Sequence, residues 1–163
     1  MDNIYTKFDW GEKLIKKYFL HNDYICIYNS PKSESHVLDF IFLHNKTLQL
    51  IYVEVKAKTH RKFYYDNGVD FRLFYVYRKL IEKNNLQNVF YILFVDPITK
   101  TCYGNTFEKL TEVKYACSKC NNPDRKIKYP LYDGDKYVYF PLAYMNTYFE
   151  FKDKKITKIK EII

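Results

Sequence analysis

The stretch from residue 38 to residue 58, LDFIFLHNKTLQLIYVEVKAK, places Asp39, Glu54 and Lys56 within two runs that are otherwise largely apolar. Residues 44–47, His-Asn-Lys-Thr, interrupt the runs and are typical of the turn of a β-hairpin. A chain that carries this pattern is expected to fold around a hairpin whose two strands bring charged groups into the interior.

The hairpin predicts which side chains share a face. A symmetric loop of two or four residues sets residue 43 opposite residue 48 and Asp39 opposite Tyr52. Because side chains alternate between the faces of a strand, Asp39, Tyr52, Glu54 and Lys56 then point to the same side. Two carboxylates and an ammonium group are thus predicted to converge on one face.

Burial makes this convergence chemically informative. The second strand is apolar on both faces, as in the centre of a covered sheet; its apolar residues are Leu48, Leu50, Ile51, Val53 and Val55. Burying an unpaired charge costs on the order of several kcal/mol, so such groups are normally paired or hold a metal. A divalent cation between Asp39 and Glu54 would remove their repulsion, and magnesium, for which manganese can substitute, suits such a set. The alternative is an edge strand on which Glu54 and Lys56 form a solvated pair.

An aspartate on one strand followed by Glu-X-Lys on the next resembles the signature of the PD-(D/E)XK nuclease superfamily. Here the residues are Asp39 and Glu54-Val55-Lys56, and Leu38 stands where the signature has proline. The resemblance covers residues 8–110 and implies a restriction-endonuclease-like fold.

The resemblance also implies a function. It implies Mg²⁺-dependent hydrolysis of phosphodiester bonds, with Asp39, Glu54 and the backbone carbonyl of Val55 as metal ligands. Lys56 would orient the attacking water or stabilise the transition state. The products would carry 5′-phosphate and 3′-hydroxyl ends.

Residues 9–20 are predicted to form an amphipathic helix with Asp9 as its N-cap. The apolar stripe of this helix consists of Phe8, Ile15 and Phe19. Glu12 falls on the same face, where members of the superfamily carry a glutamate that reaches toward the metal. The alternative is a glutamate at the edge of the stripe, stabilised by the helix dipole.

Downstream, the sequence predicts a turn at Asn67-Gly68, a helix from a cap at Asp70 to about Lys83, and a buried strand from Asn88 to Asp96. The order helix, strand, hairpin, helix, strand predicts an α/β fold whose central mixed β-sheet is flanked by helices.

The rest of the chain is expected to add a C-terminal β/α segment, about 111–163, to a single domain spanning residues 1–163. A hairpin is predicted around Asp133-Gly134-Asp135, and a short helix over residues 143–151. The last residues, from 152 onward, are interpreted as a final strand or a frayed tail.

The composition favours a polyanionic partner. Lysine and arginine number 27 against 19 acidic residues, a formal charge of +8, and tyrosine and phenylalanine are abundant. Lysines bind phosphates and flat rings stack on bases, so we expect nucleic acid, with DNA favoured. The predicted contact residues are Lys58, His60, Arg61, Lys62, Arg72, Tyr77 and Lys79. The alternatives are a solvated helix face for the helical cations and a core position for Tyr77.

The cysteines pose a separate question. Cys117 and Cys120 have the spacing of half a zinc knuckle, but a structural zinc site needs four ligands. Cys102 could join them, with His60 as a remote fourth ligand. We expect reduced thiols rather than zinc.

The sequence also indicates what to exclude. It lacks a signal-peptide pattern and an apolar run long enough to span a bilayer, so an intracellular protein, cytoplasmic or nuclear, without a membrane partner is expected. It also lacks a GxSxG elbow and a P-loop. A homodimer is plausible if both strands of a duplex are cut. The alternative function is a non-catalytic nucleic-acid-binding or protein-interaction module.

Overall fold

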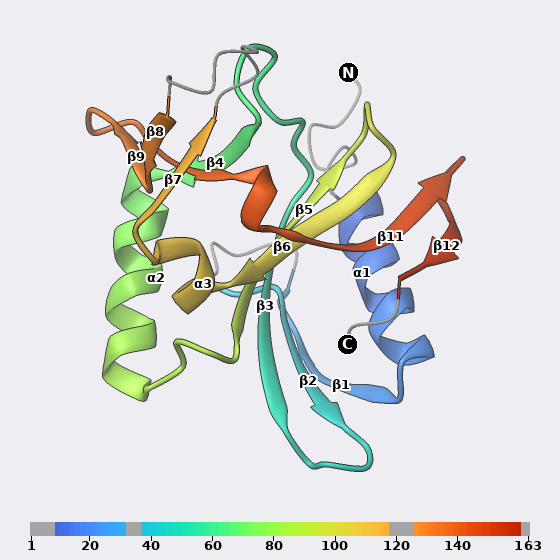
Figure 1. Cartoon of the computed structure of the whole chain (residues 1–163). Helices are drawn as coiled ribbons and strands as arrows, with labels where there is room; N and C mark the ends of the chain where they lie inside the picture. The colour runs from blue at the N-terminus through green and yellow to red at the C-terminus, as the bar shows by residue number, and fades with distance from the viewer. Residues whose placement is uncertain (1–8, 32–36, 118–125, 161–163) are drawn as a thin grey trace, which may run out of the picture.

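The computed structural model describes residues 9–31, 37–117 and 126–160 (Figure 1). Its first element is α1 (Asp9–His21), which confirms the predicted N-terminal helix. The side chains of Leu14, Ile15, Tyr18 and Phe19 are buried beneath it. Phe8, which was predicted to extend this stripe, lies outside the described residues.

A seven-stranded mixed sheet forms the centre of the molecule, in the order β1-β2-β3-β5-β6-β11-β12. These strands span Tyr24–Asn29, Phe40–His44, Leu50–Lys56, Phe90–Asp96, Thr101–Thr106, Asn146–Lys152 and Lys155–Ile159, in the same order. The β3–β5 pair is parallel and the other neighbours are antiparallel. The predicted mixed α/β architecture is therefore confirmed at this level.

The hairpin exists, but its predicted register is wrong by two residues. Phe40 pairs with Val53 and Leu43 with Leu50, so residue 39 lies across from residue 54 rather than from Tyr52. The cause is a loop displaced by one residue along the chain. It covers residues 45–48 rather than 44–47, ends in Leu48 with a left-handed φ of 58°, and is closed by a hydrogen bond from the His44 N–H to the Gln49 carbonyl. A shift of two residues keeps every side chain on its predicted face.

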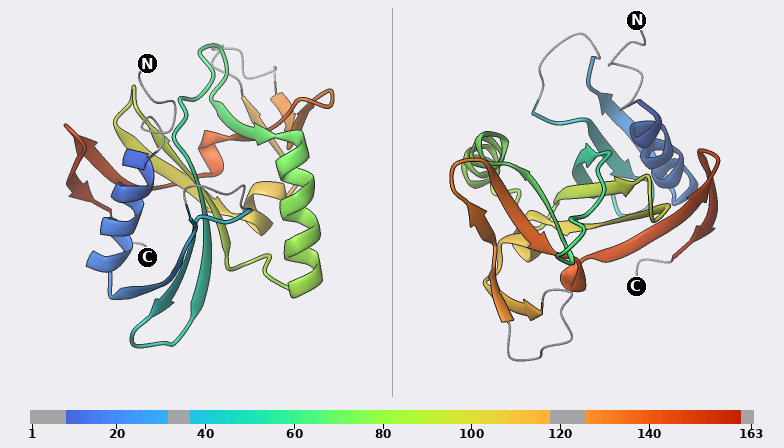
Figure 2. Two further views of the ribbon diagram at one scale, coloured as in Figure 1. Left: turned by 180° about the vertical axis from the view of Figure 1, so that it is seen from behind. Right: turned by 90° about the horizontal axis from the view of Figure 1, so that it is seen from above.

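The sheet separates two apolar cores. Alternate residues of β3 and β5, among them Val53, Val55, Leu93 and Val95, face α1. Phe90, Ile92 and Phe94 face the opposite core, which is covered by α2 (Phe71–Asn84) and α3 (Phe107–Thr111). Figures 1 and 2 show α1 and α2 on opposite sides of the sheet.

The start of α2 is as predicted, but the segment before it is not. The Asp70 carboxylate caps the helix by accepting a hydrogen bond of 2.8 Å from the Arg72 N–H. The predicted turn at Asn67-Gly68 is wrong, because both residues belong to β4 (Asp66–Asp70), which pairs with β10 (Tyr137–Pro141). A Cβ at Gly68 would lie 2.4 Å from the Val138 carbonyl oxygen, so this glycine permits close strand approach rather than a turn.

The C-terminal segment contains more strand than predicted. The hairpin around Gly134 is confirmed, with β9 (Leu131–Asp133) paired to β10. The predicted helix over residues 143–151 is wrong: a short 3₁₀ turn, Leu142–Tyr144, leads directly into β11. The prediction rested on the helical spacing of Tyr144, Tyr148 and Phe151, but Tyr144 is exposed. A register shift between Thr147 and Phe149 lets the consecutive Tyr148 and Phe149 enter the same core from a strand.

The remaining strands, β7 (Lys114–Cys117) and β8 (Lys126–Tyr129), form a separate two-stranded sheet. Strand β12 agrees with the strand interpretation of the last residues. Among the described residues, no helix has the length and apolar character needed to cross a membrane.

Candidate active site at the carboxyl end of β3

A pocket of about 360 Å³ opens where β3 ends. It is lined by Glu12, Asp39, Glu54, Val55, Lys56, Ala57, Lys58 and Leu73. The lining therefore comes from α1, from the residue that precedes β2, from β3 and its continuation, and from α2. All the residues predicted from the hairpin and from the first helix to act in catalysis or metal binding meet here.

Asp39 is held rigidly across the hairpin. Its side chain is 4% exposed, and its Oδ2 accepts a hydrogen bond of 2.7 Å from the Val55 N–H. Its own N–H donates to the Val53 carbonyl oxygen at 3.2 Å. The two bonds fix Asp39 beside the last residues of β3, next to Glu54.

Glu54 is equally buried, and its two oxygens differ. Oε1 accepts hydrogen bonds from Lys56 Nζ at 2.5 Å and from the Tyr77 hydroxyl at 2.8 Å. Oε2 is buried and accepts no hydrogen bond from any residue that the structure describes. A buried carboxylate oxygen without a partner is energetically costly.

The electrostatics of Glu54 agree with this picture. Burial raises the pKa of Glu54 to about 7, with the negative charge of Asp39 adding to the effect, while Lys56 and the hydrogen bond from Tyr77 oppose it. A cation beside Oε2 would stabilise the ionised form of this carboxylate.

The donor set fits magnesium rather than zinc. Within residues 9–31, 37–117 and 126–160, no group of three or more His, Cys, Asp or Glu side chains is assembled as a metal centre. Asp39 and Glu54 supply two carboxylates, and Val55 lines the same pocket. Mg²⁺ is bound by one or two carboxylates and keeps several waters, so two carboxylates suffice. Glu12 lines the same pocket from α1.

The predicted nucleic-acid contacts are not all available to a ligand. Lys58 lines the pocket, but its Nζ donates to the Gly68 carbonyl at 3.1 Å and lies 4.5 Å from the Tyr137 ring centroid. Burial, with repulsion from Arg61 and Lys56, lowers the pKa of Lys58. Lys62 is exposed on the segment beyond it.

His60 and Arg61 are engaged with buried carboxylates. His60 Nδ1 lies 3.0 Å from Asp96 Oδ2, and the guanidinium of Arg61 makes bonds of 2.7 and 2.6 Å to Asp66. Asp66 and Asp96 are fully buried. Both side chains thus fasten the chain between β3 and β4 to the body of the protein.

The predicted contacts on α2 divide into two groups. Arg72 and Lys79 are exposed, as expected for a solvated or ligand-facing surface. Tyr77 is fully buried in the second core, the alternative that the sequence left open, and its hydroxyl donates to Glu54. Tyr77 therefore contacts Glu54 from the second core and is not exposed to a ligand.

Two functional features escaped sequence reasoning. The contact of Tyr77 with Glu54 joins α2 to β3 and has no local signal in the sequence. The polar network around Asp96 had one usable signal, an aspartate that ends an otherwise apolar strand before Pro97. Its Oδ1 accepts from the N–H groups of Ile98 and Thr99, and its Oδ2 also accepts from the Tyr103 hydroxyl.

Of the cysteine pair considered as zinc ligands, Cys120 lies outside the described residues. Cys117 is exposed on β7. Cys102 is buried in the first core, which raises the pKa of its thiol, and His60 is engaged by Asp96. Among the described residues, Cys102 and His60 do not form a metal-binding group with Cys117.

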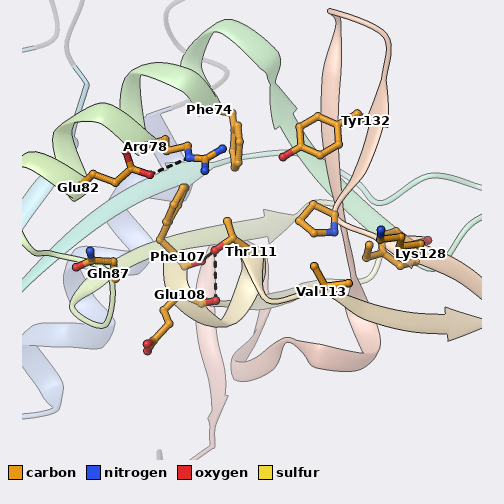
Figure 3. Close-up of a pocket in the computed structure, with 12 residues that line it drawn as sticks. Phe74, Arg78, Glu82, Gln87, Phe107, Glu108, Thr111, Val113, Lys128 and Tyr132 are labelled. Carbon is orange, nitrogen blue, oxygen red and sulfur yellow. Dashed lines mark hydrogen bonds and ion pairs between the residues drawn. The ribbon is translucent and has the colours of Figure 1, made fainter.

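A second pocket, of about 430 Å³, is lined by residues of α2 and α3, among others (Figure 3). Phe74, Phe107 and Tyr132 form its apolar walls. Its rim carries the pair Arg78–Glu82, joined by a hydrogen bond of 2.9 Å in which both side chains are solvated. It holds none of the buried carboxylates of the first pocket, so the candidate chemistry lies at the end of β3.

Comparison of the chain with models of protein families and with curated protein sequences finds no match.

Proposed function

We propose that this protein is a Mg²⁺-dependent nuclease that hydrolyses phosphodiester bonds in nucleic acid, with DNA as the favoured substrate, on a restriction-endonuclease-like core. One observation carries the proposal. Asp39 and Glu54 are buried side by side in an open pocket, and one oxygen of Glu54 lacks a hydrogen-bond partner among the described residues. The arrangement is suited to binding a cation together with the phosphate of a substrate.

In this proposal, Asp39, Glu54 and the Val55 carbonyl hold the magnesium. Bound there, magnesium supplies positive charge for the scissile phosphate and acidity for a water molecule. Lys56 places its ammonium group at the same mouth of the pocket, where it stabilises negative charge that develops on the phosphate and orients the attacking water. Glu12 contributes a further carboxylate from α1.

Tyr77 and Lys56 have distinct tasks at Glu54. The hydroxyl of Tyr77 donates to Oε1 from the core side, and Oε2, which has no hydrogen-bond partner among the described residues, would be available to the cation. The ammonium group of Lys56 is paired with Glu54, and it would be available to the phosphate if a bound cation balanced the charge of that carboxylate.

The test is a cleavage assay with labelled single-stranded and duplex DNA and RNA, in Mg²⁺, Mn²⁺ or EDTA. We expect cleavage that requires the metal, leaves 5′-phosphates, and falls by about 10²-fold or more in Asp39→Asn and in Lys56→Ala. Lys46→Ala is the matched control, because Lys46 lies at the hairpin tip in a solvated pair with Asp23. Cleavage that is equal in all three variants would sink the proposal.

One observation favours a second candidate, a binding module without catalysis. The Nζ of Lys56 already lies 2.5 Å from Glu54, so the lysine itself partly compensates the buried charge. Calorimetric titration with Mn²⁺ separates the two. Binding that disappears in Asp39→Asn supports the nuclease, whereas nucleic-acid binding with neither metal binding nor turnover supports the module.

A further inference from the structure

The chain between β3 and β4, residues 57–65, is hereafter called the β3–β4 segment. It begins at the proposed active site, since Ala57 and Lys58 line the pocket of Asp39 and Glu54. Figure 1 shows it as the long loop that rises from β3 and returns to β4. It contains neither helix nor strand.

Buried polar groups nevertheless fix its path. The Asp96 carboxylate accepts hydrogen bonds from both the N–H and the ring of His60, at 3.3 and 3.0 Å. Asp66 binds the Arg61 side chain twice, and its carbonyl accepts from the Arg61 N–H at 3.0 Å. The Asn67 side chain donates to the Lys58 carbonyl at 3.0 Å. A segment held at this many points is preorganised rather than a free loop.

The fixed segment presents aromatic rings to solvent. Phe63 is 74% exposed, Tyr65 46% and Tyr64 37%. Each ring lies next to a cationic or imidazole group: Lys62 Nζ is 5.5 Å from the Phe63 centroid, the Arg61 guanidinium is 4.1 Å from the Tyr64 centroid, and the Tyr65 ring is stacked on His60. Because the three residues are consecutive, their rings form a local group rather than the singly scattered apolar side chains that are normal on a folded surface, and such groups mark contact sites.

The positions of the basic side chains favour contacts of the β3–β4 segment with bases rather than with phosphates. Two of the four basic side chains in this part of the chain, His60 and Arg61, are engaged with buried carboxylates, which leaves fewer of them available to phosphates than the sequence alone indicates. What the segment offers outward is chiefly the faces and edges of aromatic rings, with Lys62 beside them. Rings stack on nucleobases, and a base face is accessible only where the strand is unpaired.

From these observations we propose that the β3–β4 segment is a platform on which unpaired bases of a nucleic-acid strand stack, which directs the nuclease toward single-stranded regions. Phe63 and Tyr64 stack on bases, while Lys62 contacts a neighbouring phosphate. The inference rests on the proposed function for the position of the scissile phosphate, at the pocket where the segment begins. The ligand is an unpaired strand of either DNA or RNA, since stacking uses the base alone.

The test measures binding rather than cleavage. Fluorescence anisotropy in EDTA compares one labelled oligonucleotide as a single strand with the same oligonucleotide in a duplex, as DNA and as RNA. We expect the single strand to bind more tightly than the duplex. Phe63→Ala and Tyr64→Ala should each weaken single-strand binding by about tenfold or more while leaving duplex binding nearly unchanged.

Two further variants sharpen the test. Phe63→Leu keeps an apolar side chain but removes the ring, so it should lose affinity as Phe63→Ala does. Tyr115→Ala removes a ring that is 57% exposed on β7, in a different sheet, and should bind as the unmodified protein does. Thermal unfolding of each variant verifies that it is folded.

The outcomes separate this inference from the proposed function. Equal affinity for single strand and duplex, or unchanged binding in Phe63→Ala and Tyr64→Ala, overturns the platform even if metal-dependent cleavage occurs. Ring-dependent binding of single strands without cleavage in Mg²⁺ or Mn²⁺ overturns the nuclease and leaves the platform intact.

Discussion

The two oxygens of the Glu54 carboxylate differ in their hydrogen bonds, and the hydroxyl of Tyr77 contributes to this difference. Tyr77 and Lys56 both donate to Oε1, whereas Oε2 is buried and has no hydrogen-bond partner among the described residues. A partner behind a metal ligand fixes its orientation, and removing such a partner typically costs 10–100-fold, as an order of magnitude, in metal affinity or activity.

We therefore predict that Tyr77→Phe weakens Mn²⁺ binding by about 10–100-fold, measured by calorimetry, without unfolding the protein. The matched control is Tyr18→Phe. Tyr18 is also a fully buried tyrosine, on α1, but its hydroxyl has no hydrogen-bond partner among the described residues. Its loss should leave metal binding unchanged and stability equal or higher. Equal metal affinity in the two variants would contradict the assigned role of Tyr77.

The site could be predicted from sequence only as far as local alternation reaches. Asp39, Glu54 and Lys56 were predicted to share a face, and they line one pocket, because an error of two residues in the register preserves the face. The contact between Tyr77 and Glu54 depends on how α2 packs against β3, and a periodic pattern contains no information on such a pairing.

At the scale of elements, the β3–β4 segment and β5 depend on each other through Asp96. Burial of Asp96 opposes its ionisation, but the hydrogen bonds from His60, Thr99 and Ile98 outweigh this effect and lower its pKa below the ordinary value. A carboxylate whose pKa is lower in the folded than in the unfolded state stabilises the fold above its unfolded pKa. That stabilisation is lost as the pH falls through the folded pKa.

We predict that Asp96→Asn lowers the free energy of unfolding at pH 7 by roughly 1–3 kcal/mol, since an amide cannot accept from all the donors now present. The difference from the unmodified protein should shrink as the pH falls below about 4, where the carboxylate itself becomes protonated. Urea unfolding at a series of pH values measures this. The control is Asp135→Asn in the exposed β9–β10 turn, for which a small, pH-independent difference is expected. A deficit in Asp96→Asn that persists undiminished at pH 3 would count against the assigned contribution.

The elements that the sequence predicted well are those with a strong internal period. The apolar stripes of α1 and α2 and the apolar run of β5 are local signals, and all three elements are present within one or two residues of the predicted bounds. Strands β4 and β11 were missed for opposite reasons. The Asn-Gly pair in β4 is a sequence typical of turns, although it lies within a strand. The aromatic residues of β11 do not alternate as in a regular strand, because the strand has a register shift, and their spacing was therefore interpreted as helical.

At the scale of the whole molecule, the sheet constrains the chain most tightly where β5 and β6 meet. Gly104 pairs with Leu93, and a Cβ at this position would lie 2.2 Å from the Ile92 carbonyl oxygen. Backbone cannot yield as a flexible side chain can, so an added methyl group must displace a central strand.

We predict that Gly104→Ala destabilises the protein by about 1–3 kcal/mol, seen as a lower Tm. Gly11→Ala is the matched change in α1, where the new Cβ would lie 3.4 Å from the Ala57 Cβ, an ordinary contact. Alanine favours a helix over glycine by up to about 1 kcal/mol, so this variant should be as stable or more stable. A Tm for Gly104→Ala at or above that of the unmodified protein would show that the sheet accommodates the methyl group.

The parallel pairing of β3 with β5 also sets an order of events during synthesis. A nascent chain that has emerged as far as Tyr65 already contains Asp39, Glu54 and Lys56. It still lacks Tyr77, which orients Glu54, and Asp96, which fastens the β3–β4 segment. The carboxylates can acquire their final geometry only after α2 has crossed over and β5 has docked beside β3. A ribosome-bound fragment that ends before Asp96 would thus lack the assembled pocket on which the proposed activity depends, so the site forms only after β5 has joined the central sheet.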